Sequence, residues 1–438
     1  GPEKTVEIRA GNRLELDHRG LQAPGTLAFN VVERGSGRAL DARISVRSGY
    51  KPLIKFLGDK TFFTELKPVG HSTLLVAPGQ YEFDISAGGG FTAPVQGHSV
   101  QVESGATRQV KVEVPVQSHP ARQHWYAIDL HHHSDVLDGF TAPDYVLRSE
   151  LAAGMDFSFL SDHDSMVNNP EMKRLSSTRS IPFLAATELS PSWAHFNVYP
   201  VAEEAQIDID VGAATVQEVF SLGRRLGAEL VHVNHPYGDY GYFDSLETEV
   251  VRDGKGGNAV PGGYDPGFDL VEITIDDNAQ TLAKVWQLWN VGHRAYLVGG
   301  SDVHDVWNEK TGRSRSYVYI EDEPTLERLV SALKQGHSFA TQGPLIFPRR
   351  HFGSELKHPA GEALSLSFEL AAVSGLKSVA LIEQGRAIQT RDFEGTPSSA
   401  AQVFTVHPRS DTWYSLVVED SGGKFAYSNP LWITVLNQ

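Results

Sequence analysis

The sequence predicts a multidomain α/β protein in which a central α/β unit is flanked by N-terminal and C-terminal β-sandwich domains. Its 438 residues exceed what one hydrophobic core usually organises. Short runs that alternate apolar and polar residues fill both ends of the chain, whereas the middle repeats a rhythm of strand, loop and helix. We therefore expect domains at 1–120, 121–345 and 346–438.

The first domain is expected to be a small antiparallel β-sandwich. Alternating runs occur at 26–32 and 42–46, and 74–85 fits two strands joined at Pro78-Gly79. Glycine-rich turn clusters at 35–37 and 88–90 separate such runs. This spacing is typical of short strands that return on themselves.

The middle domain is expected to be a parallel α/β sheet or barrel. Strands are predicted at 126–130, 157–160, 182–186, 196–201, 230–233, 270–274, 295–298 and 317–320, and helices at 143–153, 213–227, 278–291 and 323–336. In such folds the active site lies at the C-terminal ends of the strands. After Gly343-Pro344 the alternating pattern returns, at 363–371, 378–383, 402–407, 413–419 and 431–436, and predicts the second sandwich.

Composition and charge exclude several classes of protein. The chain has 38 basic and 54 acidic residues and a net charge of -16, so nucleic acid is not expected as its main partner. No apolar run is long enough to span a membrane. Gly1-Pro2 has no initiator Met before it and reads as a tag-cleavage scar on a trimmed chain. We expect a periplasmic or secreted protein, with the cytoplasm as the alternative; the oligomeric state is not indicated.

The absence of Cys means that any metal must be held by His, Asp and Glu. Eleven of the 18 His lie between 121 and 345, several of them just after predicted strands. Because side chains alternate along a strand, His131 and His133 point to one side and His132 to the other. The candidate ligands are His131, His133, Asp138, His163, Glu188, His195, His235, Asp302 and His304. So many ligands predict two or three divalent ions.

The order of these motifs, H-x-H, D-H, a lone Glu with a downstream His, H-P and G-S-D-x-H, resembles the PHP (polymerase and histidinol phosphatase) superfamily. The flanking sandwiches and the segment 333–344 are similar to its CehA/McbA branch. The resemblance implies a distorted (βα)7 barrel with up to three metals. It implies that His131, His133 and Asp302 hold the first, that Glu188 bridges to a second on His195 and His235, and that Asp138, His163 and His304 hold a third.

The metal identity is left open among Zn, Mn and Fe. Asp138 stands where some members of the superfamily have a His, and its oxygen shifts the preference of the third site toward Mn or Fe. His232 is expected to face away from His235, and His293 and His337 lie in or beside predicted helices, so these three are left out of the site.

Closely spaced divalent ions can deprotonate a bridging water at neutral pH. The resemblance therefore implies a hydrolase that uses a metal-bridging hydroxide, with phosphate mono- or diesters as the first choice of substrate. Glu188 and Asp302 are the predicted catalytic groups, and Arg313 is a candidate phosphate clamp, with a surface salt bridge as its alternative. A metallo-esterase or amidase acting on carboxylic or carbamic esters, and a non-catalytic surface- or carbohydrate-binding protein, are the alternative functions.

The expected partner is a small-molecule ester, and an aromatic one is an option. Trp193, Trp307, Tyr237, Tyr240 and Tyr242 lie close to candidate ligands in the sequence. The segment 237–243 is rich in Gly and Tyr and is predicted to be a mobile loop that faces a ring-bearing substrate.

Overall fold

The computed structural model describes residues 6–7, 10–11, 13, 15, 22–49, 61–88, 91–247, 260–276 and 278–436. Contacts divide the chain into two compact units. The first comprises Gly1–Ser118 with Leu151–Gly154, and the second comprises His119–Glu150 with Met155–Gln438. The division into three domains stays a prediction. Among the described residues, no helix has the length and apolar character needed to cross a membrane.

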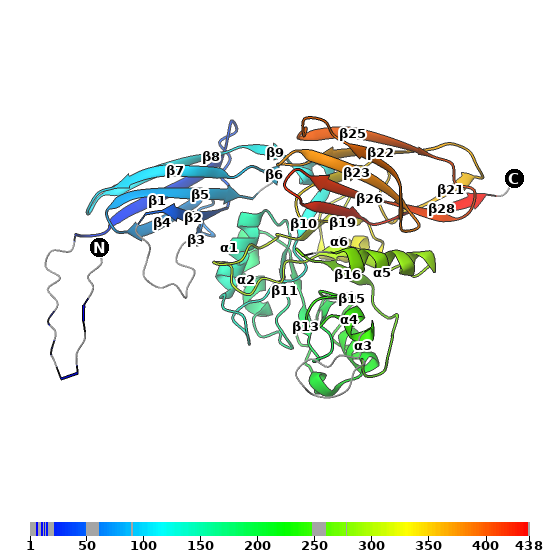
Figure 1. Ribbon diagram of the computed structural model, residues 1–438. Coiled ribbons are helices and arrows are strands. Elements are labelled where there is room, and N and C mark those ends of the chain that lie inside the picture. The colour runs from blue at the N-terminus through cyan, green and yellow to red at the C-terminus, as the bar shows by residue number, and fades with distance from the viewer. Residues whose placement is uncertain are drawn as a thin grey trace. The chain divides into compact units, whose positions relative to one another are not determined.

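The first unit contains two facing sheets, ordered β4-β1-β8 and β3-β2-β5-β7, whose strands lie in the blue and cyan part of Figure 1. The strands of this unit are β1 Gly25–Glu33, β2 Ala42–Ser48, β3 Thr61–Phe63, β4 His71–Val76, β5 Gly79–Ala87, β6 Phe91–Thr92, β7 Val95–Val102, β8 Thr107–Val114 and β9 Val116–Ser118. Phe29 and Phe83 meet edge to face at 5.2 Å between the sheets. The pairing is not wholly antiparallel as expected, because β1 and β8 run parallel.

The second unit begins with the elements that surround the candidate ligands. Its first strands are β10 Trp125–Ile128, β11 Ser158–Leu160, β12 Phe183–Ala185, β13 Thr187–Leu189, β14 Phe196–Tyr199, β15 Leu230–Val233, β16 Leu270–Ile273, β17 Tyr296–Gly299, β18 Arg315–Tyr319, β19 Ser338–Thr341 and β20 Leu345–Pro348. Its helices are α1 Pro143–Ala153, α2 Asn169–Arg179, α3 Val216–Arg225, α4 Tyr242–Glu247, α5 Ala279–Asn290 and α6 Leu326–Lys334.

Side-chain caps explain where two of these helices, α3 and α6, begin. Thr215 and Glu218 form a capping box at the start of α3, and the side chain of Thr325 accepts a hydrogen bond from the N–H of Arg328 at the start of α6. Helices α2 and α4 were not predicted from the sequence. Helix α2 is largely polar and its apolar buried side chains are Met172 and Leu175, so its apolar stripe is too narrow to detect.

The sheets of this unit are mixed, and a (βα)7 barrel is not shown. Strands β11 and β12 form a parallel pair, and β13-β14-β15-β16-β17 form a second sheet in which only β15, β16 and β17 are mutually parallel. Six residues separate β13 from β14, too few for a parallel crossover, so the chain turns back as a hairpin. Strand β10 pairs antiparallel with β18 in a third sheet. The described strands thus form a mixed α/β fold whose sheets do not close.

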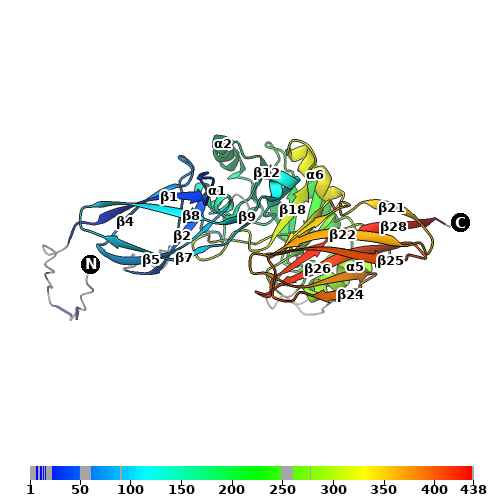
Figure 2. The ribbon, with the colours of Figure 1, turned by 90° about the horizontal axis from the view of Figure 1, so that it is seen from above.

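Most of the C-terminal strands join the sheet that contains β10 and β18, whereas β22 and β25 do not. They are β21 Glu355–Pro359, β22 Leu364–Ala371, β23 Leu376–Glu383, β24 Arg386–Asp392, β25 Ser399–Val406, β26 Thr412–Asp420, β27 Phe425–Ser428 and β28 Leu431–Leu436. The sheet runs β10-β18-β19-β27-β26-β23-β24, and β20-β22-β25 form a separate sheet. Figure 2 labels β18, β24 and β26 of the first sheet and β22 and β25 of the second. Helix α5 packs against the sheet that contains β26, because the ring of Trp289 lies 5.0 Å from that of Trp413 in β26.

Candidate metal centre

Two short β-bridges bring the candidate ligands together. His132 bridges in parallel to Val303, which places the His131–His133 segment, after β10, beside Asp302 and His304, after β17. His163, after β11, bridges to Glu188 in β13. Because each segment lies at a strand end, side chains far apart in the sequence converge on one volume.

Glu188 lies at the centre of this volume and is fully buried. Each of its two carboxylate oxygens faces ring nitrogens. Oε1 lies 3.3 Å from Nε2 of His131, 3.2 Å from Nδ1 of His195 and 3.6 Å from Nε2 of His235, and Oε2 lies 2.8 Å from Nδ1 of His163 and 3.4 Å from Nε2 of His133. One carboxylate therefore touches five imidazoles.

Two aspartates complete the cluster. Oδ1 of Asp302 lies 3.2 Å from Nε2 of His131 and 3.1 Å from Nε2 of His133. Oδ1 of Asp138 lies 3.6 Å from Nε2 of His163 and 3.4 Å from Nε2 of His304. The structure thus places all nine candidate ligands in one continuous cluster. His131, His133 and Glu188 are fully buried, whereas the side chain of Asp138 is 63% exposed. The cluster therefore opens to solvent at the Asp138 end.

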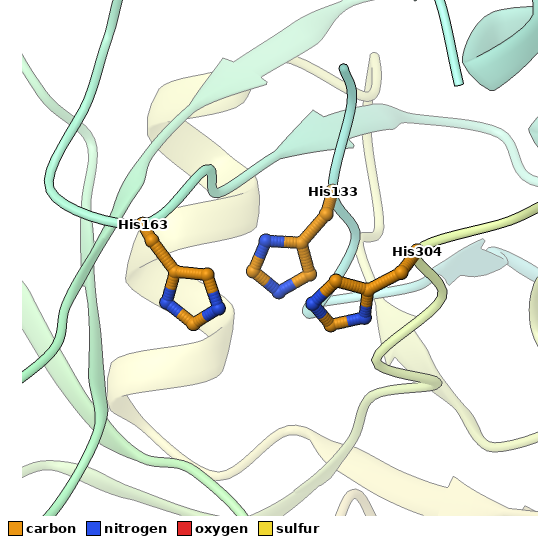
Figure 3. Close-up of side chains that lie close together, drawn as sticks. All are labelled: His133, His163 and His304. Carbon is orange, nitrogen blue, oxygen red and sulfur yellow. The ribbon is translucent and has the colours of Figure 1, made fainter. Parts of the chain in front are cut away.

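Three groups within the cluster are compact enough to hold an ion. They are His131, His133 and Glu188; His163, Glu188 and His195; and His133, His163 and His304. Figure 3 shows the third group, with the ring of His133 between those of His163 and His304, at centroid distances of 4.6 and 4.0 Å. His133 therefore neighbours the residues expected on a third metal as well as those expected on the first. The assignment of ligands to individual ions stays a prediction.

The spacing of the donor atoms fits shared divalent ions. Bonds of about 2.0–2.1 Å to a tetrahedral ion place neighbouring ligand atoms about 3.3 Å apart, and most contacts in the cluster lie between 3.1 and 3.6 Å. Among the described residues, the buried Nε2 of His304 makes no hydrogen bond, and the nearest carboxylate oxygen, Oδ1 of Asp138, lies 3.4 Å away. A positive ion would satisfy this nitrogen, so the residues fit the expected metals.

The pKa shifts of Glu188 and His133 also favour the binding of a positive ion. Burial alone would raise the pKa of Glu188, but the positive charges of His131 and His195 hold that pKa well below its usual range. Burial lowers the pKa of His133 to about 4, which keeps this ring neutral and able to donate a lone pair to a metal. Glu188 is therefore ionised and His133 is unprotonated at neutral pH.

Two supporting residues were missed in the sequence. Glu272, fully buried in β16, lies 3.1 Å from Nδ1 of His131. Asn234 donates from Nδ2 to Oε1 of Glu188 at 2.7 Å. The signal for Glu272 was present, because it is the one charged residue in the apolar strand Leu270–Ile273. Asn234 had a signal too, since it precedes the candidate ligand His235.

The histidines set aside in the sequence lie outside the cluster of donors. Nε2 of His132 lies 3.0 Å from Oγ1 of Thr311, and its Nδ1 lies 3.1 Å from the carbonyl of His133. Nδ1 of His232 lies 3.5 Å from the hydroxyl of Tyr199. Burial lowers the pKa of His132 to about 3 and that of His232 to about 4, so both rings are neutral parts of the core.

Arg313 makes two hydrogen bonds to the backbone beside a candidate ligand. Its Nε and Nη2 donate to the carbonyl of Ser301 at 3.2 and 3.1 Å, directly before Asp302. This contact differs from both interpretations of Arg313 in the sequence, a phosphate clamp and a surface salt bridge. The clamp stays a prediction.

The aromatic residues near the ligands have mixed surroundings. Tyr240 stacks on His195 at 4.7 Å, with the rings 4° from parallel. Tyr242, by contrast, is fully buried and begins α4 with Phe243, so the predicted mobile loop 237–243 is wrong over its last two residues. Tyr242 and Phe243 pack on Phe268, and this burial drives the segment into a helix.

No protein-family model matches the chain. Over 107 residues the chain is 32% identical to a 3',5'-nucleoside bisphosphate phosphatase of Chromobacterium violaceum, a match that covers 24% of this chain and 38% of that protein.

Two solved structures were also compared. One is a two-domain protein of Bacteroides vulgatus containing a predicted PHP-like metal-dependent phosphoesterase, with a TM-score of 0.39, 14% identity, and coverage of 70% of this chain and 95% of that one. The other, from Bifidobacterium adolescentis, is described as a metal-dependent phosphoesterase, with a TM-score of 0.33, 12% identity, and coverage of 47% and 94%. Similarities with TM-scores this low support no conclusion about the fold or function of this chain. What stands is a resemblance to a phosphatase over about a quarter of the chain.

Proposed function

We propose that the protein is a metal-dependent hydrolase of phosphate mono- or diesters. The observation that carries this proposal is the position of Glu188, a fully buried carboxylate shared by two of the three groups that can hold an ion. A carboxylate between two ions is the arrangement of two-metal hydrolytic sites. Membership of the PHP superfamily and of its CehA/McbA branch belongs to this proposal and is supported by the motif order.

His131, His133 and Asp302 would hold one ion, and His195 and His235 a second, with Glu188 between them. Asp138, His163 and His304 would hold a third at the open end. Such ions supply a lowered pKa for a water and neutralisation of phosphoryl charge. The protein itself contributes orientation: Asn234 donates to Glu188 and leaves the remaining lone pairs of that carboxylate directed at the histidines.

Phosphate esters are preferred over carboxylic or carbamic esters because the relative of known activity is a phosphatase. The match to that protein covers 24% of this chain, so the substrate class is the first part of the proposal to test.

An exposed apolar rim at the open end supports a substrate with an apolar or aromatic group. Leu137 and Phe140 flank Asp138 and are 78% and 60% exposed, and the N–H of Phe140 donates to the carbonyl of His304. Val167 is 69% exposed. Its neighbour Asn168 donates from Nδ2 to Oγ of Ser134, which lies in the same loop as Leu137 and Phe140. A leaving group that lies against this rim would bury apolar surface that water now covers.

The test combines elemental analysis with a substrate panel. Protein purified without added metal is analysed for Zn, Mn and Fe and assayed on p-nitrophenyl phosphate, bis-p-nitrophenyl phosphate, p-nitrophenyl acetate and an aryl carbamate. We expect at least two ions per chain, and phosphate ester hydrolysis that is lost on chelation and in Glu188→Gln. The matched control is Glu150→Gln, which alters another fully buried carboxyl that accepts from the N–H of Phe159. Hydrolysis of carboxylic or carbamic esters alone would overturn the phosphate assignment.

A further inference from the structure

We propose that Glu272 is a positioning residue that fixes two metal ligands at once, His131 through its ring and His235 through its backbone. The inference rests on the proposed metal centre but does not depend on which ester is hydrolysed. Glu272 is not one of the nine predicted ligands. Its carboxylate belongs to β16, which runs parallel to β15 just before the His235 turn.

Both oxygens of Glu272 are engaged. Oε1 lies 3.1 Å from Nδ1 of His131, and Oε2 accepts a hydrogen bond from the backbone N–H of His235 at 2.5 Å. A carboxylate at Nδ1 favours the ring tautomer with its proton on that nitrogen. Nε2 of His131 then keeps its lone pair, and this is the atom that faces Glu188 and Asp302.

The second contact holds a strained piece of backbone. His235 has a φ of 27°, in the left-handed region that non-glycine residues rarely adopt, and Pro236 follows it. Such a conformation persists only where its surroundings hold it in place. The hydrogen bond from the N–H of His235 to Glu272 supplies that restraint and directs the ring of His235 toward Glu188.

The position of Gly300 independently supports the contact between Glu272 and His131. A Cβ at this position would lie 2.2 Å from Oε1 of Glu272 and 2.6 Å from Cβ of His131. Any side chain here would therefore push the carboxylate and the imidazole apart. The glycine beside Ser301-Asp302 leaves room for the contact between Glu272 and His131, in addition to allowing a turn.

The variant Glu272→Gln keeps the size of the side chain and removes one acceptor. Its single carbonyl oxygen can accept from Nδ1 of His131 or from the N–H of His235, but not from both. We expect Zn²⁺ and Mn²⁺ to bind about 10- to 100-fold more weakly, the usual effect of losing an outer partner of a metal-binding histidine. The affinities are measured on metal-free protein, without substrate, by competition with a chromophoric chelator.

Glu150→Gln is the matched control, because it also changes a fully buried carboxyl, but one that accepts its hydrogen bond from the N–H of Phe159, which is not one of the nine ligands. Its affinity for both ions should equal that of the wild type. Unchanged affinity in Glu272→Gln, or equal weakening in the two variants, would overturn the proposal.

A measurement on the wild type covers the case in which Glu272→Gln does not fold. In zinc-loaded protein labelled with ¹⁵N-histidine, the ring of His131 should show an exchange-protected proton on Nδ1, identified by its loss in His131→Gln. Absence of that proton would overturn the role of Glu272. If the wild type binds metal and Glu272→Gln binds it weakly, yet no phosphate ester is hydrolysed, the proposed function fails and the positioning role stands.

Discussion

Nδ1 of His163 lies 2.8 Å from Oε2 of Glu188 in the metal-free protein. Burial would lower the pKa of His163, but the contact with Glu188 and the charges of Glu188 and Asp138 outweigh it and raise this pKa to about 8. Below that pH the folded, metal-free protein holds a proton on a ring that must be unprotonated to bind a metal. Metal binding is therefore coupled to proton release.

We expect the affinity for Zn²⁺ or Mn²⁺ to fall as the pH drops below about 8, by up to roughly tenfold per pH unit for each proton displaced. The sign follows because the raised pKa favours the protonated, metal-free state at lower pH. Isothermal titration in two buffers of different ionisation enthalpy measures the protons released. An affinity that stays flat between about pH 6 and 8 would contradict the coupling.

Asp302→Asn should remove metal and hydrolysis together. Oδ1 of Asp302 lies between Nε2 of His131 and Nε2 of His133, and a neutral amide there supplies no charge to hold an ion. Asn also tolerates the positive φ of this position, 50°, so the backbone should keep its conformation. We expect a loss of about 4 kcal/mol of transition-state stabilisation, roughly a thousandfold in rate.

The measurement for Asp302→Asn is metal content and turnover on one sample, with far-ultraviolet circular dichroism as the check that the β-rich regions remain folded. Full turnover in a folded variant would remove Asp302 from the site.

Arg313→Ala should impair the hydrolysis of phosphate and carboxyl esters alike. The guanidinium anchors the carbonyl of Ser301, so its loss should loosen Asp302 whatever the substrate. We expect kcat/KM to fall about tenfold for both classes, the scale of one hydrogen bond from a charged donor, with Arg313→Lys intermediate. A rise in KM confined to phosphate esters would instead support the clamp predicted from the sequence.

The clustering of the candidate ligands could be predicted from sequence because most of them stand in short motifs next to predicted strands, where the local pattern is strong; their role as metal ligands stays a prediction. His131 and His133, for instance, follow an apolar strand directly. Glu272 shows what this approach misses: its contacts are with His131, which follows β10, and with His235, which follows β15, and no local sequence pattern reveals that these segments meet β16. The sequence did not reveal the antiparallel turn between β13 and β14 either. The predicted strand 182–186 ended directly before β13, so the short strand that carries Glu188 was not recognised as a strand of its own.

Phe140→Ser should weaken aromatic substrates selectively. Phe140 is 60% exposed beside the open end of the cluster, and its backbone N–H donates to the carbonyl of His304. Because the bond to His304 uses the backbone, serine leaves it intact while it removes the apolar ring. Partial burial of such a ring is worth about 1 kcal/mol, so KM for 1-naphthyl phosphate should rise about fivefold, while KM for glycerol phosphate stays unchanged.

The matched control for the rim is Val291→Ser, at the C-terminal end of α5, because Val291 is 80% exposed and follows a helix that supplies none of the nine ligands. Leu137→Ser, on the other side of Asp138, should reproduce the effect of Phe140→Ser. Equal changes for the two substrates, or the same effect in Val291→Ser, would show that the rim does not contact the leaving group. A selective effect in both rim variants would place the aromatic part of the substrate over Asp138, at the solvent-exposed end of the cluster.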